Sequence, residues 1–588
     1  MKQFFKFMFA SMLGTFLTMI VVMFIFFGFI GSMIAFSKKD IVAVQPNSIL
    51  HIKLDGVIQE RTPANPFANF DFNKMESKNE PGLNDIIACI GAAKNDANIK
   101  GVFLDLSTIQ AGMASVEEIR NALIDFKTSG KFIYSYSEVY SQKAYYLATV
   151  SNKIYLNSQG MVDFRGLGAE LMFYKGLLQK LDVKIQVVRH GKFKSAVEPF
   201  ILDKMSAANR EQTREFIGSI WQQFVKGISE TRKISEPEIQ NIADNMLVQD
   251  AEGALKYKFV DSLIYKDQML DILKNKVGTK HDPGFVALAD YKRAVNFDDD
   301  KKFTRNRIAV IYAYGNIVSG EGTDESIGSL RISNAIRNAR LDTSIRAIVL
   351  RVNSPGGDAL ASDIIWREVV LAKNVKPVVV SMGDYAASGG YYIACGATKI
   401  IANPNTITGS IGVFGIIPNL QKMFSNKLGI TFDTIQTNKN SIYLTGKRPM
   451  SAYQEMVLQR EIEHIYKTFI THVAEGRKMT VAEVDSIGQG RVWSGTDAKR
   501  IGLIDEFGGM DVAVAEAAKL AKLDKYKVVE YPKQKMFFNQ LMEAFTGAST
   551  STLLEKELGQ NYVYYKALQT ITDLKGVQAR LPFVVNFN

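Results

Sequence analysis

Gly383-Asp384-Tyr385-Ala386-Ala387-Ser388-Gly389-Gly390 places a single serine among small residues, directly after the apolar run Pro377-Val378-Val379-Val380. The chain then continues into Tyr391-Tyr392-Ile393-Ala394. An apolar strand that reaches a small-residue turn and continues as a helix presents the serine hydroxyl at the mouth of that turn. There the N–H of Gly389 can point at a developing oxyanion. The pattern predicts a strand, a sharp turn and a helix around a nucleophilic Ser388; an ordinary tight turn is the alternative.

Length and composition set the class of protein. A chain of 588 residues is long enough for two to four substantial cores, and 47% hydrophobic with 22% charged residues is typical of globular proteins. The net charge of +11 is spread along the chain and forms no basic stripe interleaved with aromatic residues. We therefore expect no nucleic-acid partner, whereas affinity for anionic membrane surfaces is compatible with the charge. Cys89 and Cys395 show no metal-binding spacing and are expected to be small buried apolar residues, not a disulfide.

The N-terminus predicts a membrane anchor within residues 1–40. Residues 7–37 carry no charge and are rich in Phe, Met, Ile and Val. About 20 apolar residues span a bilayer, whereas the core of a signal peptide is roughly 7–15 residues long, so a cleaved leader is the weaker alternative. The positive charge before the apolar run, from the free amine, Lys2 and Lys6, slightly exceeds the charge after it, where Asp40 follows Lys38 and Lys39. This margin favours an N-terminus inside the cell and a large domain outside the cytoplasm.

The rest of the chain contains an internal duplication. At one constant offset, without gaps, Ile86 falls on Ile332, Leu104 on Leu350, and Asn157 on Asn403. In each copy, short apolar strands alternate with helical stretches, which predicts an α/β fold with largely parallel sheets and crossover helices. We expect a first α/β repeat at residues 46–305, a second at 306–532, and a helical C-terminal extension at 533–588. Within that extension, Met536 to Phe545 has the pattern of an amphipathic helix.

The two copies differ at the residues that carry chemistry. The second copy has Arg351-Val352-Asn353-Ser354-Pro355-Gly356-Gly357 where the first has Asp105-Leu106-Ser107-Thr108-Ile109-Gln110-Ala111. Adjacent glycines after a strand let backbone N–H groups approach a ligand closely, as an oxyanion hole requires. Ser388 aligns with Gln142, and Gly389 with Lys143. Only the second copy is therefore expected to hold a nucleophile and an oxyanion hole.

A serine nucleophile needs a base. None of the histidines (His51, His190, His281, His464, His472) lies in a recognisable triad pattern. A lysine can serve if burial lowers its pKa from about 10.4 towards neutrality. Lys194 is the leading candidate because small and apolar residues follow it in Ser195-Ala196-Val197-Glu198-Pro199-Phe200. Near the matching position of the second copy, Lys439 stands in a polar run and is the weaker candidate.

Together, the turn around Ser388, Arg351 to Gly357, Thr408-Gly409-Ser410-Ile411-Gly412 and Lys194 to Phe200 resemble the signal peptide peptidase A family, also called protease IV, in its long duplicated form. The resemblance runs from about residue 48 to 530. It implies a fold of the crotonase and Clp-protease type, a Ser/Lys dyad with one member from each half, and four chains assembled into a bowl that faces the membrane. By motif, it implies that Ser388 is the nucleophile, Lys194 the base and Ser410 a partner that orients the lysine. It also implies that Gly389 and either Gly356 or Gly357 form the oxyanion hole. Lys192 is close enough in sequence to be confused with Lys194, but Lys194 has the family position.

The sequence therefore predicts a serine endopeptidase without metal or organic cofactor, anchored in the bacterial inner membrane with its catalytic domain on the periplasmic side. The resemblance implies signal peptides as substrates and a homotetramer as the assembly. Two alternatives stay open. A crotonase-type acyl-CoA hydratase or isomerase would use the same glycines with Asp358 as its acid or base, and a non-catalytic membrane scaffold would explain why one copy lacks a site.

Overall fold

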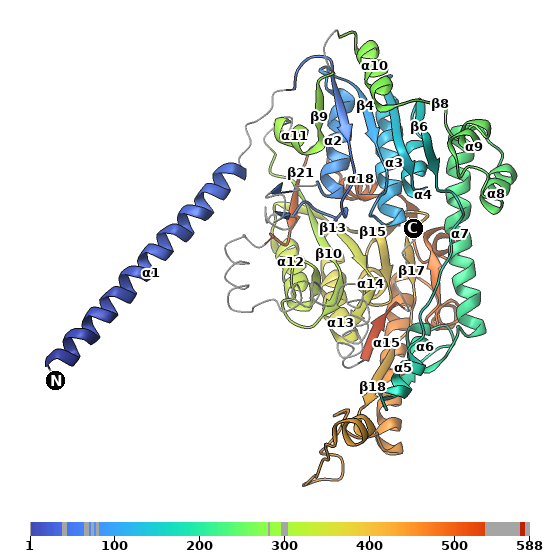
Figure 1. Cartoon of the computed structure of the whole chain (residues 1–588). Coiled ribbons are helices and arrows are strands. Elements are labelled where there is room, and N and C mark those ends of the chain that lie inside the picture. The colour runs from blue at the N-terminus through green and yellow to red at the C-terminus, as the bar shows by residue number, and fades with distance from the viewer. Residues whose placement is uncertain are drawn as a thin grey trace.

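The computed structural model of the chain describes residues 2–37, 44–63, 70–71, 76–77, 81–279, 283–295, 304–534 and 577–581. Helix α1 (Lys2–Ser37) carries the predicted anchor, drawn in dark blue in Figure 1. Among the described residues, one helix is long and apolar enough to cross a membrane, and its span is Gln3–Ile25 with a mean hydropathy of 2.2. None of that span is buried against the rest of the chain. The apolar surface of α1 is therefore free to face lipid.

The first copy is built on a parallel sheet with the strand order β8-β6-β5-β4-β1-β9. Its strands are β1 (Ser48–Ile52), β4 (Ile99–Asp105), β5 (Phe132–Tyr140), β6 (Lys153–Val162), β8 (Ser262–Leu263) and β9 (Phe285–Ala287). Its helices are α2 (Leu83–Asn95), α3 (Met113–Lys127), α4 (Gln142–Ala148), α5 (Lys175–Lys180), α6 (Glu198–Ile201), α7 (Ala207–Arg232), α8 (Glu236–Asp244), α9 (Ala251–Lys256), α10 (Lys266–Val277) and α11 (Leu288–Ala294). The short strands β2 (Phe70–Asp71) and β3 (Glu76–Ser77) pair with each other.

The second copy has a sheet with the order β19-β17-β15-β13-β10-β21, in which β16 pairs with β15, and β20 with β16. All its pairs are parallel except the one between β17 and β19. Its strands are β10 (Arg307–Tyr314), β13 (Ile345–Ser354), β15 (Val378–Ala387), β16 (Lys399–Ala402), β17 (Ile407–Gly409), β19 (Val492–Ser494), β20 (Glu506–Phe507) and β21 (Lys527–Tyr531). Its helices are α12 (Ser329–Leu341), α13 (Ala359–Lys373), α14 (Gly389–Ala394), α15 (Ala452–Arg477), α16 (Val481–Ile487), α17 (Gly495–Arg500) and α18 (Met510–Leu520).

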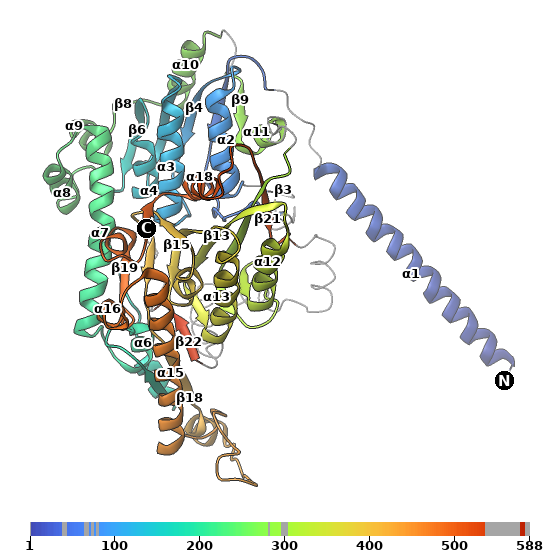
Figure 2. The ribbon, with the colours of Figure 1, turned by 180° about the vertical axis from the view of Figure 1, so that it is seen from behind.

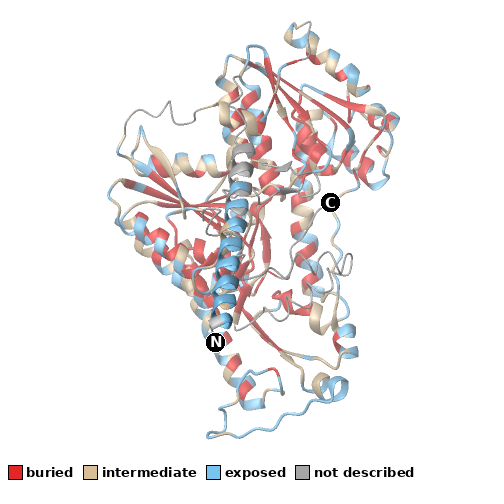
Figure 3. Ribbon diagram, turned by 60° about the vertical axis from the view of Figure 1, so that its left-hand side comes forward, coloured by how far each residue is buried: buried red, intermediate tan, exposed pale blue. Residues whose placement is uncertain are grey.

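The predicted duplication of an α/β unit is confirmed. Helices α2 and α3 of the first copy recur as α12 and α13 at the same positions relative to their sheets, and α7 recurs as α15. Figure 2 shows the sheet of the first copy above the sheet of the second, with α7 running along both. Each copy has its own apolar core under its sheet, seen as the red segments of Figure 3. The amphipathic helix that the sequence pattern predicts at Met536 to Phe545 lies outside the described residues.

A mixed sheet joins the two copies, with the order β12-β11-β14-β22-β18-β7. Its strands are β7 (Lys184–Arg189), β11 (Asn316–Val318), β12 (Ser326–Gly328), β14 (Gly356–Asp358), β18 (Phe414–Asn419) and β22 (Val577–Arg580). Strand β7 belongs to the first copy and runs antiparallel to β18 of the second. Strand β22 comes from the C-terminal extension, so the described part of that extension is a strand. The chain segment that follows β7 is thereby carried into the second copy.

Buried polar contacts tie the copies together near Ser388. The guanidinium of Arg351 on β13 is 1% exposed and pairs with Glu60 at 2.8 Å and with Glu118 at 2.7 Å, both in the first copy. Asp384 on β15 accepts hydrogen bonds from the N–H and the hydroxyl of Ser115, at 2.9 and 2.7 Å, in the first turn of α3. The strand that leads into Ser388 is therefore fixed from the opposite copy.

Candidate active site

The predicted turn is confirmed. Strand β15 ends at Ala387 and α14 begins at Gly389, so Ser388 alone makes the corner, with φ 55° and ψ −114°. A positive φ is strained for a residue with a side chain, and such strain is concentrated at functional turns. The Ser388 N–H donates to the carbonyl of Gly409 at 2.8 Å, which holds the corner against β17. The geometry is that of a nucleophile at a strand-to-helix elbow.

Lys194 reaches this corner from the other copy. It stands just after β7 and immediately before the short helical turn Ser195–Val197. Because β7 pairs with β18, the lysine side chain enters the second copy, where its Nζ lies 2.8 Å from Ser388 Oγ. Nζ also donates to the carbonyl and the hydroxyl oxygens of Ser410, both at 3.0 Å. Lys194, Ser388 and Ser410 are thus brought together as the sequence predicts.

The surroundings of Lys194 favour a neutral amine. Lys194, Ser388 and Ser410 are all 0% exposed, and the hydrogen-bond partners of Nζ are two hydroxyls and a carbonyl, none of them charged. Burial without a counter-charge lowers the pKa of Lys194 well below its usual value. A neutral amine has a lone pair that can accept the proton of Ser388 Oγ. The arrangement can therefore generate a serine alkoxide without histidine.

The predicted oxyanion glycines meet at the same corner. Gly356 and Gly357 have φ values of +102° and +159°, which suit glycine. A Cβ built on Gly389 would lie 3.1 Å from the Gly357 nitrogen, and one built on Gly356 would lie 2.8 Å from the Gly389 nitrogen. The backbone N–H groups of Gly357 and Gly389 are therefore close neighbours beside Ser388.

The other described lysines and histidines considered as the base lie away from Ser388. Lys192 places its Nζ over the ring of Phe193, 4.7 Å from the centroid, and Lys439 is exposed. Among the described histidines, His51 pairs with Asp105, His190 with Glu463, and His472 with Asp363, while His464 is exposed on α15. His281 lies outside the described residues. No hydrogen bond described for Ser388 involves a histidine.

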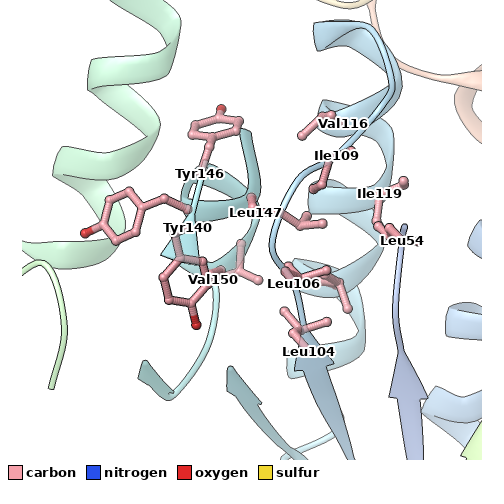
Figure 4. Packing of buried hydrophobic residues seen from close by; sticks show 14 of the residues in the cluster. Leu54, Leu104, Leu106, Ile109, Val116, Ile119, Tyr140, Tyr146, Leu147 and Val150 are labelled. Carbon is pink, nitrogen blue, oxygen red and sulfur yellow. The ribbon is translucent and has the colours of Figure 1, made fainter. Parts of the chain in front are cut away.

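In the first copy, the Gln142 and Lys143 side chains occupy the turn that corresponds to the one around Ser388. The Gln142 side chain binds the loop after β6, because its carbonyl accepts from the N–H groups of Arg165 and Gly166. The Lys143 amine donates to the carbonyl of Ala111, at the position that Gly357 has in the second copy. Leu106, Ile109 and Leu147 belong to one packed apolar cluster around this turn (Figure 4). The first copy thus keeps the fold of the turn without a nucleophile or a free oxyanion site.

Two residues that support Lys194 were not predicted from the sequence. Gln212 on α7 is 1% exposed; its amide nitrogen donates to the carbonyl of Phe193 and to Ser195 Oγ, and its amide oxygen accepts from the N–H of Val492. Gly490 packs directly on the lysine, since a Cβ there would lie 2.6 Å from Lys194 Cβ. The sequence of α7 gave no signal for a single functional amide. The described ranges contain no group of three His, Cys, Asp or Glu side chains that could hold a metal ion.

Comparison with known proteins identifies the family. The profile of peptidase family S49 matches residues 125–280 and again residues 371–524, one match in each copy. Protease 4 of Salmonella typhi is 41% identical over 81% of this chain and 78% of its own length, and Protease 4 of Haemophilus influenzae is 34% identical over 84% and 83%. The chloroplastic serine protease SPPA of Arabidopsis thaliana is 32% identical over 83% of this chain and 72% of its own.

Among solved structures, a ClpP1 mutant of Listeria monocytogenes matches 35% of this chain and 94% of its own, at 16% identity and a TM-score of 0.24. Neither a hydratase nor a scaffold is supported by the relatives above. The bacterial Protease 4 relatives and the apolar N-terminal helix fit an inner-membrane anchor. The chain belongs to peptidase family S49 and is a serine peptidase.

Proposed function

We propose that this peptidase hydrolyses peptide bonds with a Ser388/Lys194 dyad assembled from its two copies, and that cleaved signal peptides are among its substrates. One observation carries the dyad: the 2.8 Å contact between Lys194 Nζ and Ser388 Oγ in a fully buried, uncharged setting. The names of the relatives support the substrate class, since a matching protein of Enterococcus faecium, 33% identical over 198 residues, is described as a putative signal peptide peptidase.

The positions of the atoms support the following mechanism. Neutral Lys194 takes the proton of Ser388 Oγ as the oxygen attacks the carbonyl carbon of the substrate. The N–H groups of Gly389 and Gly357 donate to the tetrahedral oxyanion, and Ser410 keeps the Lys194 amine directed at Ser388. Protonated Lys194 then gives its proton to the leaving amine, which releases the C-terminal product. The Lys194 amine, neutral again, then takes a proton from water, which hydrolyses the acyl-enzyme.

The anchor gives a physical reason for membrane-bound substrates. A peptide that stays in the bilayer after its cleavage diffuses in the same two-dimensional layer as α1. Tethering the catalytic part to that layer raises the effective concentration of such a peptide at the site. We propose that the catalytic part lies on the periplasmic side, as the charges around the anchor favour. The family resemblance adds a homotetramer to this proposal, which light scattering of the detergent-solubilised full chain would test.

Substitution and labelling test the dyad. Ser388→Ala and Lys194→Ala should each reduce kcat/KM for a signal-peptide substrate by several orders of magnitude. A serine-directed acylating probe should label the wild-type chain at Ser388, and label Lys194→Ala far more slowly. Lys192→Ala is the matched control, because its amine lies two positions away along the chain and outside the site, and it should keep near-normal rates. Near-normal peptidase activity of Ser388→Ala or Lys194→Ala would show that the dyad is wrong.

A further inference from the structure

A cavity lies between the two copies, apart from the residues proposed for catalysis, none of which lines it. Its volume is about 270 Å³, close to the lower end of the roughly 300–1,000 Å³ of small-molecule sites. The first copy lines it with Gln59, Glu60 and Arg61, and the second with the end of β10, residues 323–326 and the start of α12. Strand β10 is parallel to β13, and β13 to β15, so the cavity and Ser388 lie at the same carboxyl edge of one sheet. Ligands of α/β proteins usually bind at this edge.

Three of the charged side chains at this cavity are already neutralised within the chain. Glu60 pairs with Arg351 at 2.8 Å, in the buried network between the copies. Asp324 pairs with Arg331, which belongs to α12. A ligand that broke either pair would leave a charge without its partner, and that outcome is costly. Two charged side chains at the cavity remain, and their signs are opposite.

Arg61 provides the positive charge. Its guanidinium lies over the ring of Tyr312, 4.5 Å from the centroid, and donates to the carbonyl of Pro532 at 3.0 Å. It forms no ion pair with a described carboxylate, and Glu530 is bound by the Tyr312 hydroxyl at 3.1 Å and the Asn84 amide at 3.2 Å. Burial lowers the pKa of Arg61 by more than the charge of Glu530 raises it. Since a guanidinium carries five N–H donors, Arg61 can still hold a carboxylate.

Glu325 provides the negative charge. It is exposed at the wall of the cavity and forms no ion pair within the described ranges. Hydrogen bonds hold the backbone around it: the Thr323 N–H donates to Ser326 Oγ at 2.8 Å, and the Glu325 N–H donates to Thr323 Oγ1 at 3.2 Å. The carboxylate is therefore kept beside the cavity, where it can accept hydrogen bonds from an ammonium group.

The other walls favour an organic ligand with both charges. Tyr312, Tyr314 and Ile332 give the cavity aromatic and apolar surface, which stabilises bound carbon groups. A bare anion such as phosphate would gain from Arg61 but would be repelled by Glu325. A bare cation would meet the opposite balance. A ligand with a carboxylate at one end and an ammonium at the other gains from both side chains.

We propose that this cavity binds a short unblocked peptide, with its terminal carboxylate on Arg61 and its terminal ammonium on Glu325. The volume limits the ligand to a small molecule such as a dipeptide. Each peptide bond that a peptidase hydrolyses creates one new carboxylate and one new ammonium, so repeated cleavage supplies ligands of this class. The site is separate from the Ser388/Lys194 dyad and does not depend on which residues carry out the cleavage.

Isothermal titration calorimetry of the full-length Ser388→Ala chain in detergent measures binding without hydrolysis of the probe. The probe is the dipeptide Ala-Leu, and its N-acetylated and C-amidated forms are the comparisons. Ala-Leu should bind saturably, and blocking either terminus should weaken binding about tenfold, because each block removes a charge-assisted hydrogen bond. Inorganic phosphate should not compete with Ala-Leu.

Two substitutions in the Ser388→Ala background assign the termini. Arg61→Gln should bind Ala-Leu and its amide equally and should still discriminate against the acetylated form. Glu325→Gln should lose the discrimination against the acetylated form and keep the discrimination against the amide. Arg346→Gln and Glu321→Gln remove the same charges at exposed positions outside the cavity, and both should bind all three probes like the parent chain.

Loss of discrimination at one terminus only, in the variant named for it, supports the site. No binding of Ala-Leu at millimolar concentration overturns the proposal. Binding that keeps both preferences in both variants places the peptide elsewhere, for example beside Ser388, and also overturns it. If thermal unfolding shows that Arg61→Gln is not folded, the exposed Glu325→Gln decides alone. Hydrolysis of an added peptide by the wild-type chain tests the dyad separately, so the failure of one proposal is distinguishable from the failure of the other.

Discussion

Gly490 presses on Lys194 so closely that a methyl group has no room between them: a Cβ on Gly490 would lie 2.6 Å from Lys194 Cβ and 2.7 Å from its Cα and N. Gly490 also has a φ of +81°, and its N–H donates to the carbonyl of Ile411 at 2.7 Å. The residue thus fixes the backbone of Lys194 against the loop that carries Ser410. Only a glycine allows this approach.

Gly490→Ala should therefore disable the enzyme. The added methyl group has to push Lys194 away, and a displacement of about 1 Å at a catalytic group costs roughly 100-fold in rate. Gly502→Ala is the matched control, since Gly502 has nearly the same φ, +82°, with nothing within 4 Å of its Cβ position. The control should lose about 1–2 kcal/mol of stability from the positive φ alone and keep its activity. Equal kcat/KM for the two variants would contradict this account of Gly490.

The buried amine should set the pH dependence of the reaction. Burial lowers the pKa of Lys194, and the amine acts as a base when neutral, so kcat/KM should rise with pH through that pKa and then level off. The rate at which a serine-directed probe acylates Ser388 should follow the same curve. A rate that is flat across the acid and neutral range, or that falls with rising pH there, would contradict a lysine base.

The lowered pKa of Lys194 should also make the free energy of unfolding depend on pH. The folded pKa of Lys194 lies below the unfolded value of about 10.4, so between the two the unfolded chain binds more protons than the folded one. The free energy of unfolding should therefore rise with pH in that window, by about 1.4 kcal/mol for each unit of pKa lowering. Lys194→Met lacks this contribution. Urea unfolding of both proteins at several pH values should show the gap changing in favour of the wild type as pH rises; parallel curves would contradict it.

Gln212 should act on the rate through Lys194. Gln212→Leu removes the donor to Phe193 and Ser195 and leaves the buried groups without partners, at a cost of about 1–3 kcal/mol each. We expect a lower kcat with little change in KM, because the substitution loosens the segment that holds Lys194 and does not touch the cleft. Gln222→Leu, at an exposed position of the same helix, should change neither. A rise in KM with unchanged kcat would show that Gln212 serves substrate binding.

Arg351 should hold the two copies together. Arg351→Met leaves Glu60 and Glu118 buried next to each other without a counter-charge, and breaking a buried pair in this way costs about 3–5 kcal/mol. Converting both glutamates to glutamine in the same chain should restore most of that loss. An exposed pair provides the comparison: Lys175→Met, which frees Asp203, should cost at most about 1 kcal/mol in urea unfolding. A cost for Arg351→Met as small as that of Lys175→Met would contradict the role of the network.

The sequence predicted more of the site than of the sheet that builds it. Ser388 and Lys194 could be picked out because a nucleophile elbow and a shielded lysine are local patterns. Strands β7, β18 and β22 could not be paired in advance, since each is a short strand whose partner lies far along the chain. Antiparallel pairing over such distances depends on main-chain groups that every residue carries, so it leaves little trace in side-chain patterns.

What the amino-acid sequence determined by itself is the architecture of the two copies, the apolar anchor, and the candidate residues for the chemistry. These depend on periodicity, turn residues and side-chain type, which are properties of short segments. The tertiary structure alone showed how Lys194 reaches Ser388 within one chain, that Gln212 and Gly490 support the lysine, and that strand β22 pairs with β14 next to Gly356 and Gly357. Those relationships arise where segments far apart in the chain are packed into contact, and distance along the chain says nothing about distance in space.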